Sequence, residues 1–92
     1  MRRAEEAREA EDAFRAANRD IAVVARDLNA NTLVPFLCEC SERACRAILR
    51  MPWREYAAIH EHQHRYIVAP GHELLEVEQL VSESPAYNVV EK

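Results

Sequence analysis

The most constraining feature of this sequence is a group of three cysteines, Cys38, Cys40 and Cys45, within one short segment. On an extended chain, side chains two residues apart point to the same face, so Cys38 and Cys40 can converge while Glu39 faces away. A turn after Cys40 would bring Cys45 to the same point. Three thiolates supply three of the four ligands of a tetrahedral site, so this segment predicts a structural metal centre with zinc as the expected ion.

The fourth ligand would be one of the four histidines of the chain. We predict His72, because the preceding Pro70-Gly71 turn follows an expected strand and can present the side chain from a fixed backbone. His60, His62 and His64 lie at the end of an expected helix, where alternate residues point in different directions. If that stretch is extended instead, these three share a face and form a site of their own, so the choice stays open.

The same cysteines suit two other functions. A thiol-based redox sensor is the first alternative, because the nearby Arg43 and Arg46 would lower the pKa of a thiol. A disulfide between Cys38 and Cys40 would close a strained ring, whereas either of them can reach Cys45 more easily. Three reduced cysteines that only pack as small apolar side chains are the simplest interpretation.

A small enzyme of unknown substrate is the second alternative, with Cys45 and His72 as a nucleophile and base. Glu73 follows His72, but an H-E-x-x-H motif is absent because residue 76 is Glu. A chain of 92 residues rarely encloses a substrate cleft. We therefore expect a non-catalytic regulatory or protein-interaction module.

Composition limits the setting. A length of 92 residues leaves room for one domain, residues 1–92, which we divide into an N-terminal helix at 1–30 and a cysteine-containing core at 33–92. The net charge is −4 and no stretch is basic enough to suggest nucleic-acid binding. No apolar run approaches the length of a membrane span or of a signal-peptide core. Crowded cysteines, odd in number, differ from a secreted disulfide framework, so we expect a cytoplasmic protein.

Apolar residues at spacings of three and four predict a long helix in the first segment. They are Ala7, Ala10, Phe14, Ala17, Ile21, Val24 and Leu28. The Asn29–Thr32 stretch is a plausible helix stop, since Asn tolerates a left-handed conformation. These residues form a narrow apolar seam along one face of the helix. Such a seam suits packing on the protein's own sheet, or contact with a protein partner or a second copy of the chain.

The remainder predicts an α+β fold, in which the long helix packs on a small antiparallel sheet beside a second, short helix. Residues 33–40 read as an edge strand because they contain Pro35, and 46–50 could pair back on it. A helix is expected from Trp53 to about Gln63. Strands are expected near 64–69 and 87–92, while residues 74–83 fit either helix or strand.

Several short motifs occur together: FLCEC at 36–40 with Cys45 following, Glu55-Tyr56, VAPGHE at 68–73 and a closing VVEK. In this combination the chain resembles a group of short, uncharacterised actinobacterial proteins with an FxCEC-x4-C element, a VAPGHE segment and a C-terminal VxEK. The resemblance covers roughly residues 36–92, with a weaker similarity around Phe14, Asn18 and Ile21.

That resemblance implies a lineage and a cytoplasmic setting, but no activity. The group pairs the cysteine element with G-H-E, which agrees with the choice of His72. The sequence departs from the group's pattern at 41–44 and 51–53, so the resemblance gives no expectation for the turn after Cys40.

Overall fold

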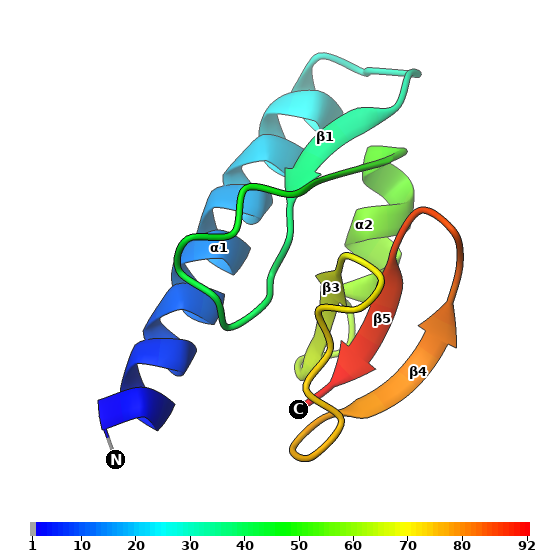
Figure 1. The fold of residues 1–92 in the computed structure, drawn as a ribbon. Helices are drawn as coiled ribbons and strands as arrows, with labels where there is room; N and C mark the ends of the chain where they lie inside the picture. Colours follow the sequence, from blue (N-terminus) through cyan, green and yellow to red (C-terminus); the bar gives the residue numbers. More distant parts are fainter. Residues whose placement is uncertain (1) are drawn as a thin grey trace.

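The computed structural model of the protein describes the backbone of residues 2–92 and the side chains from Arg8 onward. The described chain contains two helices and five strands, in the order α1 Arg2–Asp27, β1 Val34–Leu37, β2 Ile48–Met51, α2 Trp53–Ile59, β3 Arg65–Val68, β4 Gln79–Glu83 and β5 Asn88–Glu91. Helix α1 runs along one side of the molecule, with β1 beside its C-terminal half (Figure 1). The predicted α+β class is confirmed.

Helix α1 ends in a backbone motif that the sequence predicts. Asn29 adopts a left-handed conformation with φ of 52°. The Ala30 N–H then donates to the Ala25 carbonyl at 2.9 Å, and the Asn29 N–H donates to the Arg26 carbonyl at 3.0 Å. This pair of bonds is a Schellman motif, which satisfies carbonyls that the helix end would leave free.

The strands form two small antiparallel sheets where we predicted one. In the first sheet β1 pairs with β2 from Val34–Met51 to Leu37–Ile48, as expected for residues 46–50. Pro35 lies in β1, which has α1 rather than a third strand on its other side. Asn18 of α1 covers that edge, because its amide both donates to the Leu37 carbonyl and accepts from the Leu37 N–H.

The second sheet has the order β3-β5-β4, with the two C-terminal valines of β5, Val89 and Val90, buried at its centre. The ambiguous stretch 74–83 resolves into turns followed by β4. The register of β4 on β5 shifts between Leu80 and Ser82, so Val81 is an extra residue in the strand. Helix α2 ends at Ile59 and is shorter than predicted.

The core lies between α1, α2 and the strands. Its large apolar members include Phe36, Leu49, Met51, Tyr56, Ile67, Val68 and Val90. The predicted helix seam is correct at Ala10 but wrong at Val24 and Leu28, which are 57% and 76% exposed. The buried face of α1 passes instead through Asn18 and Ala25. The side chain of Ala7 lies outside the part of the chain described.

Candidate metal centre

The four predicted ligand residues lie together in space. The ligand atoms of Cys38, Cys40, Cys45 and His72 are all within 4.8 Å of one another. The His72 Nδ1 atom is 3.5 Å from the Cys38 sulfur and 3.5 Å from the Cys45 sulfur. Cys38 and Cys40 are buried, Cys45 is partly buried and His72 is exposed, so the cluster is open to solvent at its histidine.

The first three ligands are positioned by β1 and the loop that follows it. The Cys38 N–H donates to the Ala47 carbonyl at 3.2 Å, which extends the pairing of β1 with β2 toward the cluster. The chain then reverses, because the Cys45 N–H donates to the Glu42 carbonyl at 3.0 Å. The Glu42 carboxylate accepts from the Ala44 N–H at 3.1 Å. This loop brings Cys45 back to the other two cysteines.

The fourth ligand is presented by a tight turn at the end of β3. The His72 N–H donates to the Ala69 carbonyl at 2.9 Å. Pro70 and Gly71 occupy the two central positions, and Gly71 has φ of 90°. Proline followed by a residue with positive φ is the pattern of a type II turn, in which glycine is strongly preferred. The single glycine of the chain therefore places His72 at the cluster.

The crowding of the sulfurs shows in their pKa values. The pKa of the Cys38 thiol is raised, first by its hydrogen bond to Cys40 and then by burial. The pKa of Cys40 is lowered to about 5, mainly because Cys38 donates a hydrogen bond to it. Without a metal, the pair thus favours a thiolate at Cys40 beside a protonated Cys38 thiol. A bound dication would favour loss of the remaining protons, because metal ligation requires thiolates.

The donor set fits a tetrahedral thiophilic metal. Zinc–sulfur and zinc–nitrogen bonds of about 2.3 and 2.05 Å at a tetrahedral angle place sulfur and nitrogen about 3.6 Å apart. The two sulfur–nitrogen distances of 3.5 Å agree with this edge length. The Ala69 N–H donates to the Cys38 sulfur at 3.1 Å, a contact that stabilises a thiolate. The arrangement can therefore hold one metal ion with protein ligands alone.

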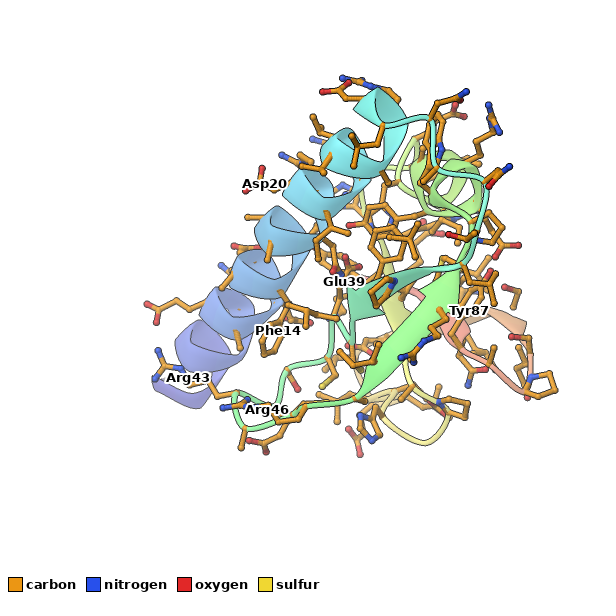
Figure 2. The ribbon with its side chains drawn as sticks, turned by 90° about the horizontal axis from the view of Figure 1, so that it is seen from above. Phe14, Asp20, Glu39, Arg43, Arg46 and Tyr87 are labelled. Atoms are coloured by element: carbon orange, nitrogen blue, oxygen red, sulfur yellow. The ribbon has the colours of Figure 1, made fainter. Side chains whose placement is uncertain are left out.

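Glu39, between the two buried cysteines, faces the opposite side and is completely buried. One carboxylate oxygen accepts from His60 Nε2 at 2.9 Å and the Ile67 N–H at 3.0 Å. The other accepts from Asn18 Nδ2 at 2.9 Å and the Tyr56 hydroxyl at 2.7 Å. Figure 2 shows Glu39 in the interior, whereas Arg43 and Arg46 lie on the peripheral loop. Two of the candidate ligands, Cys38 and Cys40, and the buried Glu39 carboxylate thus come from one backbone segment.

The sequence predicts that Glu39 points away from the cysteines but does not identify its role. The available signal was Asn18, a polar residue within an apolar helical face. The network also explains Tyr56, whose pKa is raised by burial and by the neighbouring Glu39 carboxylate. The ring of Tyr56 stacks between Phe36 and His60, with centroids 4.3 and 3.9 Å apart.

The other histidines do not join the metal cluster. His60 caps α2 and bonds to Glu39 and to the Tyr56 carbonyl, while His62 and His64 are exposed. Among the residues that the structure describes, the three cysteines and His72 form the only group with metal-ligand spacing. Of the four histidines considered for the fourth ligand, His72 alone is in place.

Comparisons of the chain with protein-family models, with curated proteins and with solved structures give no match. Within residues 2–92, neither helix combines the length and apolar character needed to cross a membrane.

Proposed function

We propose that the protein is a small zinc-binding module in which Cys38, Cys40, Cys45 and His72 hold a structural zinc ion. The observation that carries this proposal is the convergence of three sulfurs and one imidazole nitrogen within 4.8 Å. Four protein ligands complete a tetrahedral shell, which is typical of structural sites, whereas catalytic zinc sites keep one position for water. We therefore propose no catalytic role for the centre.

A bound ion would link two parts of the chain that no continuous sheet joins. Cys38 and Cys40 follow β1 of the two-stranded sheet, and His72 follows β3 of the three-stranded sheet. Because the site is assembled only in the folded state, the binding free energy adds to the folding free energy. This contribution matters in a chain of 92 residues, since small domains bury a limited core.

The proposal is tested by titrating the reduced, metal-free protein with Co²⁺ and reading thiolate charge-transfer and tetrahedral ligand-field absorption. We expect one equivalent bound, with both signatures weakened in His72→Ala and Cys45→Ser. His64→Ala is the matched control, because His64 is exposed and outside the cluster. A titration that is identical in His72→Ala and wild type would show that His72 is not a ligand.

We propose further that the module acts by protein contact through the C-terminal half of α1. Val24 in α1 and Leu28 directly after it are exposed, and Leu33 is 60% exposed. Together with Ile21 and Pro35 they line an apolar groove of about 470 Å³. An exposed apolar face of this kind is typical of an interaction surface.

A second copy of the chain is the first partner to test, by sedimentation velocity over a range of concentrations. We expect self-association that Val24→Glu/Leu28→Glu abolishes and that Val77→Glu, at another exposed apolar position, leaves unchanged. A wild-type protein that stays monomeric at every concentration would exclude the second copy, and a different protein partner would then be sought.

A further inference from the structure

A second cavity lies away from the metal cluster, between α1 and α2. Its volume is about 240 Å³. Helix α1 contributes Arg19, Val23 and Arg26, which are spaced by about one helical turn, and α2 contributes Trp53, Ala57 and His60 at similar spacing. Facing stripes of two helices thus enclose the space, and the proposed metal function makes no use of it.

The α1 side of this cavity is cationic. Arg19 forms no hydrogen bond or ion pair with any residue whose side chain the structure describes. Arg26 contacts only its neighbour Asp27, at 3.3 Å, and both side chains are more than half exposed. Such an exposed pair contributes little, so both guanidinium groups remain available to an anion. Two arginines without strong internal partners are notable in a chain of net charge −4.

The α2 side provides a flat apolar wall. The Trp53 indole N–H donates to the Ala30 carbonyl at 3.1 Å, which fixes the orientation of the ring. The Arg54 guanidinium lies 4.9 Å from the ring centroid, a cation–π contact that holds the indole further. Ala57 has a short side chain and leaves room beside the ring. Two contacts thus fix the indole beside the cavity.

His60, the residue that caps the C-terminal end of α2, also lines the cavity. Its Nδ1 lies 3.0 Å from the Tyr56 carbonyl and its Nε2 lies 2.9 Å from the Glu39 carboxylate. Both ring nitrogens therefore have protein partners within hydrogen-bond distance. Neither nitrogen is left without a partner that a ligand would have to replace.

We infer that the cavity between α1 and α2 binds a small planar carboxylate anion, with Arg19 and Arg26 as the anion ligands and Trp53 as the stacking surface. Arginine pairs with carboxylates through two parallel hydrogen bonds, and an aromatic face favours a flat ring. A cavity of about 150 Å³ holds a benzene molecule. The cavity volume of about 240 Å³ therefore suits one aromatic ring with its carboxylate.

The test is a titration of the zinc-loaded, full-length protein with benzoate, followed by two-dimensional nitrogen–proton NMR. The chain has a single tryptophan, so one indole resonance reports on the cavity. We expect saturable shifts of that resonance with a dissociation constant of about 1 mM, as befits a ligand of so few atoms. Inorganic phosphate should bind at least about tenfold more weakly, because it gains nothing from the indole.

Three variants separate the contributions. Arg19→Gln/Arg26→Gln should weaken benzoate binding at least about tenfold. Ala57→Leu should abolish binding by filling the cavity while the arginines remain. Arg50→Gln, an exposed arginine on β2, should bind like wild type. No saturable shift up to about 20 mM benzoate, or equal binding by wild type and the double variant, would overturn the inference.

Discussion

Replacing Glu39 with glutamine should destabilise the fold strongly although it changes neither the size of the side chain nor a metal ligand. The carboxylate accepts four hydrogen bonds from buried or nearly buried donors. A glutamine keeps one oxygen and places an NH₂ group where the other was. The Tyr56 hydroxyl can rotate and accept from this group, but Asn18 Nδ2 is only a donor and loses its partner at Glu39.

The magnitude follows from these contacts. One buried donor without a partner costs about 1–3 kcal/mol, and removing the charge of one partner in a buried pair costs about 3–5 kcal/mol. The two effects describe overlapping interactions, so we expect a loss of about 3 kcal/mol. A chain of 92 residues has an unfolding free energy of about 5–14 kcal/mol, so this loss is a large fraction of the total.

The assay is urea denaturation of the zinc-loaded protein, followed by far-ultraviolet circular dichroism. Glu61→Gln is the matched control, because Glu61 is exposed, and it should change the free energy by less than about 0.5 kcal/mol. Metal stoichiometry should stay at one zinc in both variants. A Glu39→Gln protein within about 0.5 kcal/mol of wild type would refute the argument that this carboxylate joins α1, α2 and β3.

Three further predictions address the turn, the buried hydroxyl groups and the thiols. Gly71→Ala should lower the unfolding free energy by about 1–2 kcal/mol and weaken metal binding. The cost comes from the positive φ alone, since no atom lies within 4 Å of the added carbon. Unchanged stability in urea would contradict the role of the turn. The unfolding free energy of the zinc-loaded protein should fall above about pH 10. The reason is that folding raises the pKa of two tyrosines: that of Tyr56, and that of Tyr87 to about 12. The unfolded chain then releases protons that the folded chain retains, so the unfolding free energy decreases with pH. If this decrease is equal in Tyr56→Phe and wild type, Tyr56 does not contribute to it. Mild peroxide should oxidise two thiols of the metal-free protein to a disulfide that includes Cys45, which intact mass detects as the loss of two hydrogens. The zinc-loaded protein should resist this oxidation. Equal oxidation of both forms would show that zinc does not bind the thiols.

Much of the fold follows from local sequence signals. The helix stop at Asn29, the pairing of residues 46–50 with the strand before them and the Pro70-Gly71 turn are each set by a few adjacent residues. The metal cluster is predictable for the same reason, since alternation on an extended chain places Cys38 and Cys40 on one face. Contacts among neighbouring residues determine these features.

Features that depend on distant contacts were not predictable. Spacing alone predicts that the apolar face of α1 continues through Val24 and Leu28. Asn18 instead forms hydrogen bonds with Leu37 and Glu39, so that a different face of the helix is buried. The segment that follows β1 meets β3 at Glu39. Its N–H donates to the Ile67 carbonyl at 2.8 Å and its side chain accepts from the Ile67 N–H, so no strand of the first sheet pairs with β3.

The most direct test of the metal centre is native mass spectrometry of protein purified without chelator, with elemental analysis of the same sample. The proposal predicts one zinc per chain, retained at neutral pH and lost together with the fold in acid, and no tightly held zinc in Cys40→Ser. A protein that carries no metal, keeps its fold and titrates three free thiols would contradict it.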